Sequence, residues 1–259
     1  MEESDYCGGE KMLSLKEIKG YAYQKKMKGT YSHVMKHLCL PFVKIFLFLH
    51  LTANQITILG IIFSYVAAGL LAFGNLYYAI AAILFLYLGE ITDYSDGTMA
   101  RIRNSVTRLQ SDLLCHFYHQ GGYALLYFGL GLGLFRITGN VLYIVFGCFG
   151  TIGHLTSSYL FETKEALLRE HHHKSVEGKI NVQMGNVGAE SKLKQRILKL
   201  FVFPVKYVRS ILLLFLLIGK LDWLVIFYGL FLPFRALIFF TSTFLFFKAE
   251  EKTLGKMPK

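Results

Sequence analysis

The stretch LYYAIAAILFLYLGEI, residues 76–91, decides the fold class of this chain, because Glu90 is its only charged residue. A helix needs about 20 mostly apolar residues to cross the hydrocarbon core of a bilayer. Five other segments are similarly apolar and of comparable length. The sequence therefore predicts an all-α integral membrane bundle of six transmembrane helices, which we place at residues 56–73, 76–91, 113–135, 141–161, 200–218 and 221–247.

The composition supports a membrane protein and excludes several other classes. The 259 residues are 54% hydrophobic and only 17% charged, yet the formal net charge is +11. A soluble domain carries about 25% charged residues, and a disordered chain has few apolar ones. A nucleic-acid binder is also basic but lacks long apolar runs, so we expect no nucleic-acid partner. The four cysteines form no C-x-x-C pair, so neither a disulfide nor a zinc framework is indicated.

The positions of the basic residues predict the orientation. Of the 28 Lys and Arg residues, 25 fall in residues 1–55, 92–111, 162–210 and 248–259, on one side of the predicted bundle. Because basic loops stay in the cytoplasm, we expect a multi-pass protein of the cell membrane with both termini cytoplasmic. The predicted parts are a cytoplasmic N-terminal segment, a six-helix catalytic domain with one long cytoplasmic loop, and a cytoplasmic tail. Their bounds are 1–55, 56–247 (loop 162–199) and 248–259.

Residues 31–50 mix apolar side chains with Lys36, His37 and Lys44. This pattern predicts a helix that lies in the membrane interface, with its apolar face in lipid and its lysines on head-group phosphates. An ordinary helix on the soluble side fits the same pattern equally well.

Four of the 17 acidic residues lie at the ends of the second and third predicted spans: Glu90, Asp93, Asp96 and Asp112. Ionisable groups at such depth are costly and suggest a functional site. Asp93 and Asp96 share one helix face with Gly97 and Ala100, and Asp112 shares another with His116 and His119. If these two faces meet, carboxylates and an imidazole suit a hard cation, Mg²⁺ or Mn²⁺. The alternative is a set of helix-end charges that pair with Arg101, Arg103 and Arg108.

The run from Asp93 to Arg101 has the pattern D-x-x-D-G-x-x-A-R, which we call the signature. It resembles the signature of the CDP-alcohol phosphotransferase (CDP-alcohol phosphatidyltransferase) family, six-helix membrane enzymes. Residues 51–60 are similar to the family's T-P-N-x-x-T-x-x-G opening of the first span, with Ala53 in place of proline. The resemblance implies transfer of a phosphoalcohol group from a CDP-linked donor to an acceptor hydroxyl, with release of CMP and a need for divalent metal. It also implies a homodimer in membrane lipid.

The family pattern continues with eight residues, a glycine, three residues, an aspartate, three residues and a final aspartate. Counted without gaps, the glycine position falls on Gln110 and the two aspartate positions fall on Leu114 and Tyr118. A register shortened by two residues places there Arg108, Asp112 and His116. We prefer the shortened register, because Leu114 cannot bind metal, and we interpret the chain as a variant with histidine at the fourth acidic position.

The resemblance implies a role for each matched residue. Asp93, Asp96 and Asp112 would bind metal, and His116 would be the catalytic base, since imidazole exchanges protons near neutral pH. His116 as a metal ligand or as a passive lining residue is equally compatible. The residues implied at the nucleotide are Asn54, Thr57, Gly97, Ala100 and Arg101.

Other roles stay open from the sequence. Asn54 and Thr57 fit equally well an N-cap and a helix-packing threonine. Glu90 and His119 are candidates for residues behind the site, which contact the site residues and not the substrate. Lys206 and Arg209 are candidates for an acceptor phosphate, or are membrane anchors.

Two other functions compete with the transferase. A family-derived binding or scaffold protein that has lost catalysis would explain Arg108, His116 and the shortened spacing. A transporter is weaker, because its charges would gather at the bilayer midplane. Neither the transferred alcohol nor the acceptor (a lipid, a small alcohol or a glycan) follows from the sequence.

Overall fold

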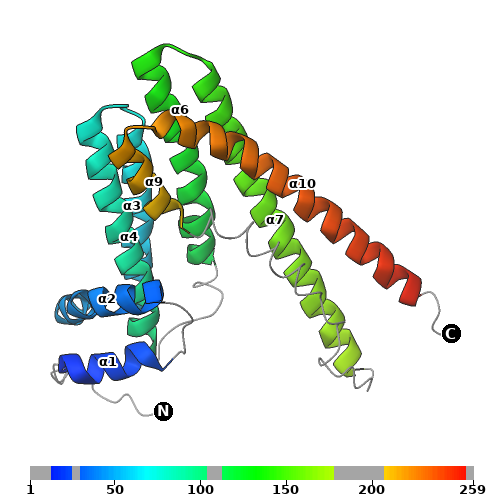
Figure 1. The fold of residues 1–259 in the computed structure, drawn as a ribbon. Coiled ribbons are helices and arrows are strands. Elements are labelled where there is room, and N and C mark those ends of the chain that lie inside the picture. Colours follow the sequence, from blue (N-terminus) through cyan, green and yellow to red (C-terminus); the bar gives the residue numbers. More distant parts are fainter. Residues whose placement is uncertain (1–12, 25–29, 104–112, 178–206, 255–259) are drawn as a thin grey trace. The chain divides into compact units, whose positions relative to one another are not determined.

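The computed structural model describes residues 13–24, 30–103, 113–177 and 207–254. Every regular element in these ranges is a helix, which confirms the predicted all-α class (Figure 1). In chain order the elements are α1 (Leu15–Tyr23), α2 (Thr30–Phe48), α3 (Ala53–Leu71), α4 (Leu76–Arg103), the π-helix η1 (Phe117–Gly121), α6 (Gly122–Thr138), α7 (Leu142–Glu177), α9 (Val208–Ile218) and α10 (Leu221–Leu254).

Four described helices are long and apolar enough to cross a membrane: α3, α4, residues 142–163 of α7 and residues 221–245 of α10. They correspond to the first, second, fourth and sixth predicted spans and indicate a membrane protein. The third predicted span contains a helical turn, η1 and most of the 17-residue α6. Residues 207–218 of the fifth are described, and 11 of them form α9. The count of six spans therefore stays a prediction.

Local signals explain where the first two spans begin and end. Thr52 and Gln55 form a reciprocal cap at the start of α3: the Gln55 amide donates to the Thr52 hydroxyl (3.3 Å), and the Thr52 amide donates to Gln55 Oε1 (2.8 Å). Gly74 ends α3 with a φ of 75°, a conformation that glycine adopts without a steric cost. The Asn75 side chain then accepts from the Tyr77 amide (2.9 Å) and caps α4.

The described chain divides into two compact units. Unit 1 combines α1, α2, the start of α3 to Ser64, α4 from Leu84 onward, and the described residues 113–119. Its core is a cluster from all four helices, which includes Ile18, Cys39, Ile56 and Met99. Burial raises the pKa of the Cys39 thiol to about 11, so the thiol is neutral in this core.

The predicted helix over residues 31–50 is present as α2, which continues past Pro41. It packs against α1 through this core and leaves Val34, Leu38, Ile45 and Phe48 exposed. Its position in the membrane interface stays a prediction.

Unit 2 contains the end of α3, the start of α4, and α6, α7, α9 and α10. Within it α7 packs against both α6 and α10 (Figure 1). Glycines allow this close packing: a Cβ on Gly131 would lie 2.9 Å from the Gly147 Cα. The helix α7 continues to Glu177, so the first residues of the predicted polar loop, 162–177, are helical.

Candidate active site

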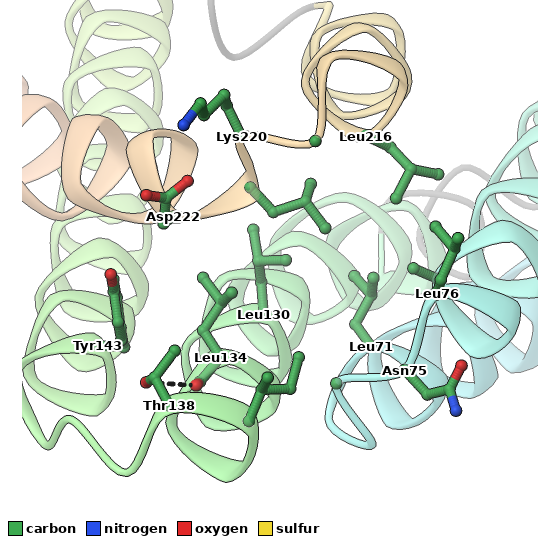
Figure 2. Close-up of a pocket in the computed structure, with 15 residues that line it drawn as sticks. Leu71, Asn75, Leu76, Leu130, Leu134, Thr138, Tyr143, Leu216, Lys220 and Asp222 are labelled. Atoms are coloured by element: carbon green, nitrogen blue, oxygen red, sulfur yellow. Dashed lines mark hydrogen bonds between the residues drawn. The ribbon is translucent and has the colours of Figure 1, made fainter.

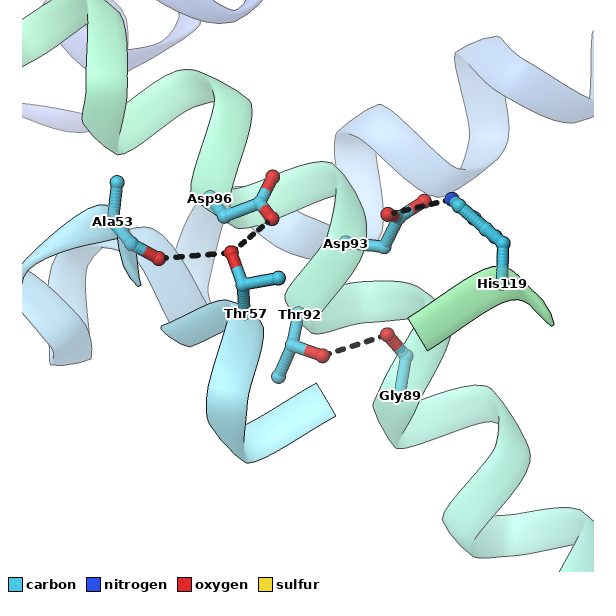
Figure 3. A network of polar contacts seen from close by, with 7 residues as sticks. All are labelled: Ala53, Thr57, Gly89, Thr92, Asp93, Asp96 and His119. Carbon is cyan, nitrogen blue, oxygen red and sulfur yellow. Dashed lines mark hydrogen bonds and ion pairs between the residues drawn. The ribbon is translucent and has the colours of Figure 1, made fainter. Parts of the chain in front are cut away.

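The two signature aspartates lie one turn apart on α4, in unit 1, and both side chains are partly exposed. Asp96 Oδ2 lies 2.7 Å from the hydroxyl of Thr57 on α3, as Figure 3 shows. The same hydroxyl lies 3.1 Å from the Ala53 carbonyl. Thr57 therefore links the first turn of α3 to the second aspartate of the signature.

Close approach of α3 and α4 makes this link possible. A Cβ on Gly60, one turn after Thr57, would lie only 2.5 Å from the Thr92 hydroxyl oxygen. The Thr92 hydroxyl itself donates to the Gly89 carbonyl (2.6 Å). Glycine at position 60 thus brings the two helices to the separation at which Thr57 reaches Asp96.

The first aspartate contacts a histidine. His119 Nε2 lies 3.3 Å from Asp93 Oδ1, and His119 belongs to η1 (Figure 3). The structure therefore places His119, which we predicted behind the site, directly against a predicted metal ligand. An imidazole in this position holds the carboxylate in one orientation.

Arg101, the last residue of the signature, reaches toward the N-terminal helix. Its Nε donates to the Tyr21 carbonyl of α1 (2.9 Å), and one terminal nitrogen donates to the Thr98 hydroxyl (3.2 Å). Beside it, a Cβ on Gly97 would meet a single atom, Arg101 Nη1, at 3.7 Å. The helix face with Gly97, Ala100 and Arg101 therefore has room for a ligand.

The structure decides one alternative that the sequence left open. Asn54 is not the N-cap of α3, because Thr52 and Gln55 make the reciprocal cap and Asn54 lies inside the first turn. The pattern T-x-x-Q at residues 52–55 contained this signal. Thr57 does contact a neighbouring helix, through Asp96.

Sequence reasoning missed the group that binds Glu90. The Tyr31 hydroxyl of α2 donates to Glu90 Oε2 (2.5 Å), and Glu90 is only 6% exposed, one turn before Asp93. The two residues are 59 positions apart, so no local pattern relates them. Tyr94 and Ser32, their neighbours on the same two helices, are also in contact (3.4 Å between oxygens).

The described residues fit a metal site in part. They contain no group of three or more His, Cys, Asp and Glu residues that would hold a metal ion. Asp112, the third predicted ligand, lies outside the described residues, and so does Arg108. Two half-buried carboxylates one turn apart, with a hydroxyl beside one of them, are nevertheless the oxygen donors that Mg²⁺ and Mn²⁺ prefer.

The remaining predicted residues are more widely distributed. His116 is exposed and lies in the helical turn before η1. Lys206 lies outside the described residues. Arg209 is in unit 2, where it is 7% exposed with its guanidinium 5.4 Å from the ring centre of Tyr123.

A second arginine of unit 2 was given no role in the sequence analysis. Arg235, on α10, donates to the Ser157 hydroxyl of α7 (3.2 Å) and stacks on Phe239. A charged residue within an apolar span was the available signal.

Comparison with protein families agrees with the signature. The model of the CDP-alcohol phosphatidyltransferase family matches residues 50–113, which include α3, α4 and the signature. A search of curated proteins finds no match to the chain. The family domain supports transfer of a phosphoalcohol group from a CDP-alcohol in a membrane. Residues 50–113 therefore match the CDP-alcohol phosphatidyltransferase family, which the signature also resembles.

Proposed function

We propose that the chain is an active membrane transferase that moves a phosphoalcohol group from a CDP-linked donor to an acceptor hydroxyl and releases CMP. The observation that carries this proposal is the pair Asp93 and Asp96, each in contact with a polar side chain of another helical segment. Carboxylates fixed in this way are prepared to hold a divalent cation without rearrangement.

In this proposal Asp93, Asp96 and Asp112 hold Mg²⁺ or Mn²⁺. The bound cation would neutralise the donor pyrophosphate. Thr57 and His119 orient Asp96 and Asp93. Gly97, Ala100 and Arg101 form the nucleotide side together with Asn54, and Gly97 leaves space beside the helix for the donor.

His116 is the proposed base that takes the proton of the acceptor hydroxyl. It is exposed, so a substrate has access to it. The family match ends at residue 113, three positions before it, so the assignment rests on the shortened register alone.

The acceptor side of the proposal concerns two arginines. Arg209 and Arg235 are arginines of unit 2 in helices that we predict to span the membrane, where charged groups are rare and usually functional. They favour an acceptor that carries a negative charge. We further propose a homodimer with cytoplasmic termini, from the family resemblance and the basic loops.

The test is CMP release by purified protein with a panel of CDP-alcohols and acceptors, with Mg²⁺ or Mn²⁺ and with a chelator. Asp93→Asn and Asp96→Asn should each abolish release. The matched control is Glu162→Gln, whose side-chain oxygen still accepts from Gln120. Turnover by Asp93→Asn at the level of this control would exclude the metal assignment.

His116→Ala separates the base from the binding residues. The variant should keep the affinity for the CDP-linked donor and lose turnover. Its kcat should fall while its KM stays unchanged. The competing function, a binding protein without catalysis, is favoured if wild-type protein binds the donor but releases no CMP with any acceptor.

A further inference from the structure

Unit 2 contains a cavity of about 440 Å³ at the end where α3, α6 and α9 finish and α4, α7 and α10 begin. All the residues that line it belong to this unit. Figure 2 shows leucines on one side, including Leu71 and Leu216, and Tyr143, Lys220 and Asp222 together on the other. The cavity thus has an apolar part and a charged edge.

Two polar groups of the lining are already used by the backbone. The Asn75 side chain caps α4 through the Tyr77 amide, and the Thr138 hydroxyl donates to the Leu134 carbonyl (2.7 Å). Lys220 and Asp222 differ: within the described ranges neither side chain has a hydrogen bond or an ion pair, and none joins the two. They are the charges that remain for a ligand.

The chemistry of the lining restricts the ligand. A volume of this size is typical of a small-molecule site, and leucine side chains offer water no hydrogen bonds. In a membrane protein the apolar part suits an acyl chain. At the edge, the Lys220 ammonium and the Asp222 carboxylate have charges that sum to zero. They favour a head group that carries one positive and one negative charge, since Asp222 repels a purely anionic head group.

We propose that this cavity binds one zwitterionic phospholipid. One acyl chain lies among Leu71, Leu130, Leu134 and Leu216, the phosphate pairs with Lys220, and the ammonium pairs with Asp222. The site does not depend on the proposed transferase, because none of its residues belongs to the signature or to residues 50–64.

The test is photo-crosslinking of the full-length protein in detergent with phosphatidylethanolamine that carries a diazirine on its acyl chain. The label, assigned to single residues by fragmentation mass spectrometry, should fall on Leu130, Leu134 or Leu216. Leu214, which is 53% exposed on the same helix as Leu216, reports non-specific labelling. Unlabelled phosphatidylethanolamine should compete at about tenfold lower concentration than phosphatidylglycerol, a difference of about 1.4 kcal/mol. Labelling at Leu214 alone, or equal competition by both lipids, overturns the proposal.

Two sets of variants examine the chain and the head group separately. Leu134→Trp and Leu216→Trp fill the cavity from two helices and should each remove the labelling, whereas Leu214→Trp should keep it. The double variant Lys220→Gln with Asp222→Asn should still bind lipid but lose the preference between the two head groups. A preference that survives in this double variant contradicts the proposed head-group contacts. Because wild-type crosslinking needs no substitution, the result stands even if a tryptophan variant fails to fold.

Discussion

Gly60 and Gly97 are glycines of facing helices with opposite surroundings. A Cβ at position 60 would lie 2.5 Å from the Thr92 hydroxyl oxygen, whereas at position 97 it would meet only Arg101 Nη1, at 3.7 Å. Gly60 is therefore needed for packing of α3 against α4. Packing does not require glycine at position 97, in keeping with our proposal that the CDP-linked donor approaches the helix there.

Gly97→Ala tests this distinction. The variant should fold and be more stable by about 0.5–1 kcal/mol, because alanine favours a helix over glycine. Binding of a CDP-linked donor should weaken by about tenfold or more, the loss expected when a methyl group displaces a close contact. Isothermal titration and thermal unfolding measure the two effects.

The matched control for Gly97 is Gly69→Ala on α3. A Cβ at position 69 would have no heavy atom within 4 Å, so this variant should gain similar stability and keep donor affinity. Equal donor affinity in the two variants would remove Gly97 from the nucleotide site.

The hydrogen bond from Tyr31 to Glu90 joins α2 to α4. Tyr31→Phe removes the donor to the buried Glu90 carboxyl group and should lower the free energy of unfolding by about 1–3 kcal/mol. Tyr94→Phe is the control, because its contact to Ser32 is long (3.4 Å) and joins two neutral hydroxyls. Denaturant titration in detergent compares them, and a larger loss in the Tyr94 variant would contradict the prediction.

At the scale of elements, α1 is held at its C-terminal end. The Tyr21 carbonyl accepts from Arg101, and the Ala22 carbonyl accepts from Lys36 Nζ (2.5 Å). The last carbonyl groups of a helix lack the usual partner four residues on, and the Tyr21 carbonyl also accepts from the Gln24 amide (3.4 Å). Cations at this end interact favourably with the helix dipole. One contact comes from α2 and the other from the signature on α4, so α1 is fixed to both.

Lys36→Met tests how α1 is held. Lys36 is 2% exposed and Lys44, on the same helix, is exposed, so Lys44→Met is a control of equal chemistry. Amide hydrogen exchange over residues 15–23 should be about tenfold faster in the Lys36 variant, since each lost 1.4 kcal/mol raises local opening tenfold. Unchanged protection of α1 in that variant would show that the Lys36 contact contributes nothing to docking.

Several elements were predictable because their signals are local. The apolar runs predicted α3, α4, α7 and α10, and the spacing of Asp93 and Asp96 predicted their common face. The contacts of Arg101 with Tyr21 and of Tyr31 with Glu90 were not predictable. They join residues 80 and 59 positions apart, and side-chain patterns along one helix contain no information about its partner.

At the scale of the whole molecule, the distribution of basic residues predicts which ends of the helices face the cytoplasm. A fluorescent protein fused after Lys259 should fluoresce, and alkaline phosphatase inserted after Lys220 should be active, because each reporter works on one side only. Phosphatase activity at the C-terminus would reverse the predicted orientation, and with it the side from which the CDP-linked donor arrives.

The separation of 80 positions between Tyr21 and Arg101 also affects the order of events during synthesis. A ribosome that adds about 5–20 residues per second completes Arg101 some 4–16 s after Tyr21 has been made. Throughout that interval the Tyr21 carbonyl lacks its guanidinium partner, and α1 cannot reach its final docked state. Complete docking of α1 thus requires that Arg101 of α4 has been translated, although α1 precedes α4 in the chain.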